Sequence, residues 1–140
     1  MVKAMEDYKY QFVLILAGYP DEMDDFMRTN PGLPSRFPIQ VDFPDYTVQQ
    51  LMQIAHLMIK EREYSFHPQT EVKLKQHLVR ELEASFGTFS NARLVRNLIE
   101  KAMRHQAVRL LQQHRQHPSK QELMTLRPED LRLDRPKTIP

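Results

Sequence analysis

Asn30-Pro31-Gly32-Leu33-Pro34-Ser35-Arg36-Phe37-Pro38 is the stretch around which the first part of the chain is organised. Proline fixes the backbone dihedral φ and lacks an amide hydrogen, and glycine favours turns, so we expect a shaped loop that is neither helix nor strand. Arg36 is the only charged residue of this stretch. An ionised guanidinium on a stiff loop suits the recognition of a phosphate group, whereas an arginine that only solvates a surface loop is the ordinary alternative.

Apolar segments on either side of this loop predict two strands. Phe12–Ala17 is a continuous apolar run that ends at Gly18-Tyr19-Pro20, and such runs are typical of central strands of parallel sheets. Ile39–Phe43 alternates apolar and polar residues, which is the pattern of a half-buried strand. Between them, Pro20-Asp21-Glu22 predicts the start of a short helix, and residues 2–10 predict the end of a preceding one.

From residue 46 onward the apolar residues recur at helical spacing. Thr47-Val48-Gln49-Gln50 is a capping box that predicts the start of a first helix, and glycine at Gly87 predicts the end of a second. Ser90 or Asn91 is expected to cap the third and longest helix, and one further helical turn is expected at Pro128–Leu131. The residues expected to face the core are Leu51, Ile54, Ala55, Met58, Val72, Leu74, Leu78, Leu82, Val95, Leu98, Ile99, Ala102 and Met103.

These patterns predict a mixed α/β fold that is mostly α. Residues 1–45 read as a partial parallel-sheet α/β piece, residues 46–133 as a small helical bundle and residues 134–140 as a disordered tail. Two buried-type strands cannot form a parallel sheet without further partners. Exposed sheet edges invite pairing between chains, so we expect dimerisation or strand exchange.

Composition excludes several classes of protein. The chain has 140 residues, a net charge of +2 and no cysteine, so neither a disulfide framework nor a thiolate zinc site is expected, and a reducing, cytoplasmic location fits. No run approaches the ~20 apolar residues of a membrane helix. The acidic first residues also lack the apolar core of a signal peptide. We therefore expect no membrane partner.

The motifs for common catalytic chemistry are missing from this sequence. Gly18, Gly32 and Gly87 are the only glycines, and none belongs to a G-x-x-x-x-G-K-[ST] phosphate loop. The six histidines show no H-x-x-x-H or H-E-x-x-H arrangement. His114 and His117 are three positions apart and could share a helix face, but a third ligand is missing, so no metal site is expected. No serine lies in a nucleophile elbow.

A second motif, Ser90-Asn91-Ala92-Arg93-Leu94-Val95-Arg96-Asn97, places a cation in the first turn of the third helix. A cation there opposes the helix dipole and usually has a compensating partner. For Arg93 that partner is either an anionic ligand such as a nucleotide phosphate or a structural carboxylate. The same helix carries a basic stripe that could bind nucleic acid or an acidic protein, although a solvated face is the more ordinary reason for it: Lys101, Arg104, Arg109 and Arg115.

Four segments together resemble an AAA+ ATPase of the stage V sporulation protein K group, whose relatives include the red-type rubisco activases. They are Phe12–Pro20, Asn30–Phe37, Asp42–Tyr46 and Asn91–Asn97, and the resemblance extends from residue 1 to about residue 131. It implies the C-terminal part of an AAA+ module, with the last strands of the nucleotide-binding subdomain followed by the helical lid. A hinge between them is expected about Pro44-Asp45-Tyr46.

The resemblance also implies roles for three residues. Arg36 matches the catalytic arginine finger that reaches the γ-phosphate in a neighbouring subunit, and Arg93 matches the sensor-2 arginine of the lid. Tyr19 lies at the sensor-1 position, where the family pattern has a small polar residue. The phosphate loop and the magnesium-binding acids are absent from this sequence, so ATP and Mg²⁺ are expected in the parent protein and no cofactor in this chain alone.

The parent protein is then expected to be an ATP-driven ring, a hexamer, that remodels an unidentified protein partner, while this chain alone is inactive. The alternative from the residues themselves is a non-enzymatic helical module that binds an acidic protein or nucleic acid through its basic third helix. Of these two partners, nucleic acid is the less expected, because no aromatic platform or DNA-reading motif accompanies the basic stripe.

Overall fold

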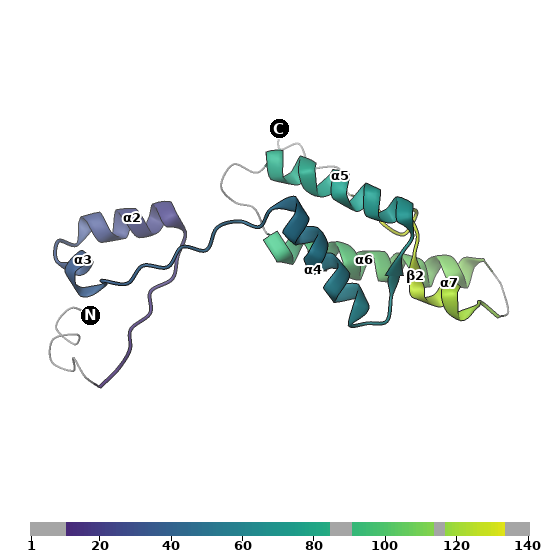
Figure 1. Ribbon diagram of the computed structural model, residues 1–140, viewed down its shortest axis with the longest axis horizontal. Helices are drawn as coiled ribbons and strands as arrows, with labels where there is room; N and C mark the ends of the chain where they lie inside the picture. Colours follow the sequence, from purple (N-terminus) through teal and green to yellow (C-terminus); the bar gives the residue numbers. More distant parts are fainter. Residues whose placement is uncertain (1–10, 85–90, 114–116, 134–140) are drawn as a thin grey trace. The chain divides into compact units, whose positions relative to one another are not determined.

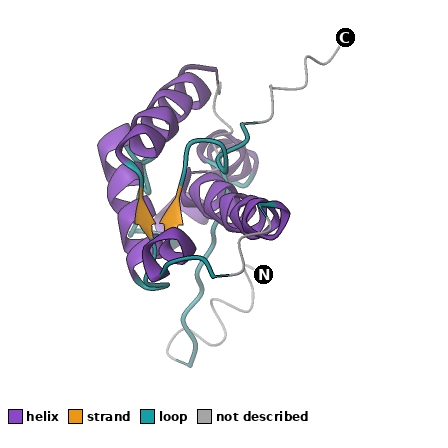
Figure 2. Cartoon of the chain, turned by 90° about the vertical axis from the view of Figure 1, so that its right-hand side faces the viewer, coloured by secondary structure: helices purple, strands orange, loops and turns teal. Residues whose placement is uncertain are grey.

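The computed structural model describes residues 11–84, 91–113 and 117–133 (Figure 1). The chain divides into two compact units, residues 1–43 and 44–140. The fold is mixed and mostly helical, as predicted, and its sheet consists of two short parallel strands, β1 (Ser65–Phe66) and β2 (Thr125–Leu126), which lie side by side in Figure 2. Among the described helices, none is apolar and long enough to cross a membrane.

The first unit contains the helices α2 (Pro20–Thr29) and α3 (Leu33–Arg36). The helix start predicted at Pro20 is confirmed. The prediction of a non-helical loop over residues 30–38 is wrong, because α3 forms one helical turn within it. Gly32 adopts φ 101° in the left-handed region and turns the chain, and Pro34 fits the start of a helix, where no amide hydrogen is needed.

The two strands predicted in the first unit are absent from its described residues. Phe12–Ala17 and Ile39–Phe43 are both irregular, which corrects the sequence prediction. A parallel strand requires hydrogen bonds from neighbouring strands, and no described segment supplies them. Most apolar side chains of these segments are therefore exposed, 87% at Val13 and 90% at Phe43. The helix predicted over residues 2–10 lies outside the described residues.

The second unit is a helical bundle of α4 (Val48–Lys60), α5 (Pro68–Ala84), α6 (Asn91–Gln112) and the short α7 (Lys120–Met124). Helix α4 packs against both α6 and α5. The buried apolar core comes from all three long helices and from the C-terminal segment: Leu51, Ala55, Ile59, Leu74, Leu78, Val95, Leu98, Ile99, Ala102, Leu126 and Leu131.

The predicted starts of the first and third helices of the bundle agree with α4 and α6. The capping box at the start of α4 is confirmed, since the Gln50 amide donates to Thr47 Oγ1 and the Thr47 amide donates to Gln50 Oε1. Val72 is exposed, so its predicted inward position is wrong. The predicted boundary residues Gly87 and Ser90 lie outside the described residues.

The C-terminal segment differs from its prediction. Pro128–Leu131 was predicted to form a helical turn, but these residues are not helical and contain an ordinary turn. The helix of this segment, α7, lies earlier and begins at a second capping box, formed by Ser119 and Glu122, which was not predicted. Buried polar groups hold this segment on the bundle: Thr70 Oγ1 donates to the Leu126 carbonyl at 2.9 Å, and Gln106 Nε2 donates to the Leu123 carbonyl at 2.9 Å. Both hydrogen bonds and apolar contacts therefore hold the C-terminal segment in place.

Helix α5 carries a histidine that makes stability depend on pH. The His77 side chain is only 11% exposed, and burial lowers its pKa below 6.5, although Glu81 at 3.7 Å acts in the opposite direction. Below pH 6.5 the unfolded chain therefore binds a proton that the folded chain binds only at lower pH. Stability is full above pH 6.5 and is lost as the pH falls through the folded-state pKa.

His77→Gln is expected to flatten this dependence. Urea unfolding of the wild type should give a lower free energy of unfolding at pH 5 than at pH 7, and the variant should show a smaller difference. His56→Gln, at a more exposed position on α4, is the matched control and should keep the wild-type difference. An unchanged pH dependence in His77→Gln would contradict the assignment.

Candidate functional site

Arg93 lies in the first turn of α6 and is exposed. Among the residues that the structure describes, its guanidinium forms no ion pair or hydrogen bond. The structural carboxylate considered for it is therefore absent from the described part of the chain. A cation at this position is disfavoured by the helix dipole by about 0.3–1 kcal/mol. The site is thus electrostatically suited to an anion that is not part of the described chain.

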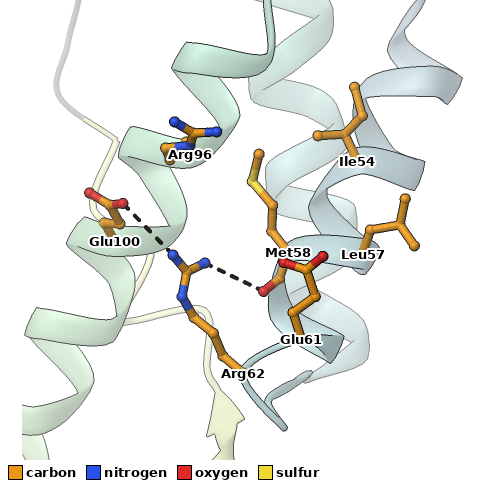
Figure 3. Close-up of a pocket in the computed structure, with 7 residues that line it drawn as sticks. All are labelled: Ile54, Leu57, Met58, Glu61, Arg62, Arg96 and Glu100. Carbon is orange, nitrogen blue, oxygen red and sulfur yellow. Dashed lines mark hydrogen bonds and ion pairs between the residues drawn. The ribbon is translucent and has the colours of Figure 1, made fainter.

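A pocket of about 420 Å³ opens between α4 and α6, one turn along from Arg93 (Figure 3). Arg62 lies in the turn after α4 and reaches toward Glu100 on α6, with 3.9 Å between Nη2 and Oε1. Its Nη1 donates to the Met58 carbonyl at 3.4 Å. Arg96 also lines the pocket, which has an apolar side and charges of both signs: Ile54, Leu57, Met58, Glu61, Arg62, Arg96 and Glu100. Because two carboxylates accompany the two arginines, the pocket itself is a poor site for a polyanion.

Arg36 is the last residue of α3 and is partly buried. Its Nη1 donates to the Gly32 carbonyl at 2.9 Å, so the guanidinium folds back over its own helical turn. A Cβ atom on Gly32 would lie 2.9 Å from this Nη1. Glycine is favoured at this position by its left-handed φ, whereas the contact with the flexible guanidinium of Arg36 is one that the arginine can relieve by moving.

Tyr19 immediately precedes α2 and is exposed. Its carbonyl accepts from the Met23 amide at 2.9 Å, while its side chain makes no capping hydrogen bond to the helix. Tyr19 and Arg36 belong to the first unit and Arg93 to the second, so the three predicted residues are distributed over both.

The residues of the basic stripe predicted along α6 differ in burial and in their partners. Arg109 forms a two-bond pair with Asp130, 2.7 Å from Nε to Oδ1 and 2.9 Å from Nη2 to Oδ2, and the Asp130 side chain is only 1% exposed. This hydrogen bonding raises the pKa of Arg109 above its ordinary value. Lys101 and Arg104 are exposed, and Arg115 lies outside the described residues. Arg109 is thus a structural residue, which weakens the case for a nucleic-acid or acidic-protein surface.

No cluster suited to a metal ion occurs in the described ranges, where no three histidine, aspartate or glutamate side chains are grouped for coordination. No local pattern in the sequence marks the buried acid Asp130, because its partner Arg109 is 21 positions away. The contacts of Asn91 with Asp45 and Tyr46 also have no local signal, although all three residues lie in segments that carry the family resemblance.

This chain is similar to one protein family and to several known proteins that are related to AAA+ ATPases. Residues 47–139 match the family described as the AAA lid domain. The chain is 53% identical over 132 residues to stage V sporulation protein K of Bacillus subtilis (strain 168), covering 94% of this chain and 40% of that protein. It is 39% identical over 131 residues to the protein CfxQ homolog of Trieres chinensis, covering 94% of this chain and 44% of the relative.

A third relative is the chloroplastic ribulose bisphosphate carboxylase/oxygenase activase of Cyanidioschyzon merolae (strain NIES-3377 / 10D), 37% identical over 131 residues. This alignment covers 94% of the present chain and 44% of the activase. The chain therefore spans less than half the length of these three relatives.

Proposed function

Because this chain belongs to the AAA lid domain family and carries the lid of stage V sporulation protein K- and CfxQ-type AAA+ ATPases, we propose that it forms the C-terminal part of an ATP-hydrolysing module. In this proposal, residues 1–45 complete the nucleotide-binding subdomain, residues 46–133 form the lid and residues 134–140 form a tail. The nucleotide and Mg²⁺ are held by a phosphate loop and acids that this sequence does not contain. The lid contributes a cation to the bound triphosphate.

The observation that carries the proposal is the environment of Arg93. Its guanidinium is exposed at the N-terminus of α6 and has no ion-pair partner among the described residues. A triphosphate satisfies both this cation and the partial positive charge of the helix end. We therefore assign Arg93 the role of the sensor-2 arginine, which contacts the nucleotide of its own subunit.

Arg36 and Tyr19 complete the assignment in the first unit. Arg36 is proposed as the arginine finger for the nucleotide of a neighbouring subunit, because a guanidinium stabilises the charge that develops on a transferring phosphoryl group. Tyr19 is proposed to lie near the nucleotide at the sensor-1 position. This division requires a closed ring, for which we propose a hexamer in the cytoplasm that remodels a protein partner.

Arg93→Ala tests the proposal in an AAA+ ATPase that contains these residues. Loss of one charge-assisted contact to phosphate is expected to raise the KM for ATP by about tenfold or more. Arg104→Ala, an exposed arginine three turns further along α6, is the matched control and should leave the KM unchanged. Steady-state ATPase assays give both values. Wild-type kinetics in Arg93→Ala would contradict the proposal.

A further inference from the structure

Asn91, the first residue of α6, holds the connecting segment Asp45-Tyr46 that leads into α4. The Tyr46 amide donates to Asn91 Oδ1 at 2.9 Å, and Asn91 Nδ2 donates to the Asp45 carboxylate, across 45 and 46 positions of sequence. We propose that Asn91 is a positioning residue that fastens the connecting segment to the N-terminus of α6 and thereby sets the place of Arg93. This inference rests on the nucleotide role proposed for Arg93.

The chemistry of the contact explains why an asparagine occupies this position. A side-chain amide offers an acceptor and a donor on one short side chain, and the connecting segment presents a backbone donor and a carboxylate acceptor to match them. Asn91 also adopts φ 42°, a left-handed conformation that asparagine tolerates better than most residues. An aspartate would lack the donor and would place a second negative charge beside Asp45, and an alanine would lack both groups.

The contact also determines where the chain can bend between the two units. Asp45 and Tyr46 are bonded to Asn91, and the Thr47 amide is bonded within the capping box of α4. On the other side, Phe43 is almost fully exposed and follows an irregular segment. Bending is therefore expected at a joint at Phe43-Pro44, before the connecting segment. This joint shares only Pro44 with the hinge predicted about Pro44-Asp45-Tyr46.

Arg93 follows Asn91 by two residues in the same helical turn. A displacement of this turn, such as one that brings Arg93 to a triphosphate, must move the connecting segment with it for as long as the two hydrogen bonds last. Without them, the helix end and the incoming chain can move separately. Asn91 therefore couples the position of the Arg93 guanidinium to the position of the chain at Phe43-Pro44.

The first experiment measures hydrogen exchange of the Tyr46 amide by NMR in this 140-residue chain, without nucleotide. Asn91→Ala is expected to speed exchange by about tenfold, the equivalent of one lost hydrogen bond. Asn91→Asp should also speed exchange, because it repels Asp45. The double variant Asn91→Asp with Asp45→Asn exchanges donor and acceptor and should restore wild-type protection.

Asn97→Ala is the matched control, because Asn97 lies on the same helix, is exposed and has no hydrogen bond among the described residues. It should leave Tyr46 exchange unchanged. Wild-type exchange in Asn91→Ala, or failure of the double variant to restore protection, would overturn the fastening role.

The second experiment measures ATPase kinetics in an AAA+ ATPase that contains these residues. Asn91→Ala is expected to raise the KM for ATP by roughly threefold to tenfold, and the double variant should recover the wild-type KM. If Asn91→Ala speeds Tyr46 exchange but leaves the KM unchanged, the positioning role is overturned. If the nucleotide role proposed for Arg93 is wrong, Arg93→Ala will instead show the wild-type KM for ATP. The results for hydrogen exchange of the Tyr46 amide would still hold in that case.

Discussion

Arg36→Ala is expected to reduce ATP hydrolysis by about 10³-fold or more in an AAA+ ATPase assembled from subunits that contain this chain. The expected loss is in kcat, because an arginine finger stabilises charge in the transition state, while the affinity for ATP should change little. The hydrogen bond from Arg36 to the Gly32 carbonyl must open for this role, which requires the guanidinium to leave its own helical turn. Steady-state turnover and equilibrium binding of ATP measure the two effects separately.

Two controls make this result specific. Arg28→Ala removes an exposed arginine of α2 and should leave turnover unchanged. Mixing Arg36→Ala subunits with subunits disabled in their phosphate loop should recover part of the activity, because some sites then combine an intact loop with an intact neighbouring Arg36. Unimpaired turnover in Arg36→Ala would remove the residue from its proposed role, and no recovery on mixing would argue against action between subunits.

Asp130→Ala is expected to destabilise the second unit by about 3–5 kcal/mol, because it leaves the largely buried Arg109 cation without its hydrogen-bonded carboxylate. The Arg109 side chain is only 12% exposed, and its Nη1 already lacks a hydrogen-bond partner within the described structure. Asp130 also accepts from the Arg127 amide at 2.8 Å, so its loss frees a third donor. Urea unfolding monitored by circular dichroism measures the change in the free energy of unfolding.

The matched control for this prediction is Glu129→Gln, an exposed neighbour whose carboxylate lies 3.9 Å from Arg109. It is expected to change stability by less than about 1 kcal/mol, as exposed ion pairs usually do. The double variant Arg109→Met with Asp130→Leu removes both charges and should recover much of the lost stability. If Asp130→Ala lowers the free energy of unfolding by less than about 1 kcal/mol, the Arg109–Asp130 pair contributes little to stability.

The predicted helix starts of α4 and α6 agree with the structure because their signals are local. The capping box at Thr47 operates between residues three positions apart, and the apolar spacing of α4 and α6 depends on one helical period. Arg93 was placed in the first turn of its helix for the same reason. In the first unit, the apolar run Phe12–Ala17 has the composition of a buried strand, yet the described chain supplies no partner for it.

The fold class, the helical bundle and the family resemblance follow from the sequence, and so does the proposal of Tyr19, Arg36 and Arg93 as candidate residues. Which side chains pair between distant segments follows from the three-dimensional structure alone. It pairs Arg109 with Asp130 across 21 positions and joins Asn91 to Tyr46 across 45. Periodicity and capping extend over a few residues, whereas such pairs form only when packing of the core brings distant segments together, and no local pattern specifies that meeting.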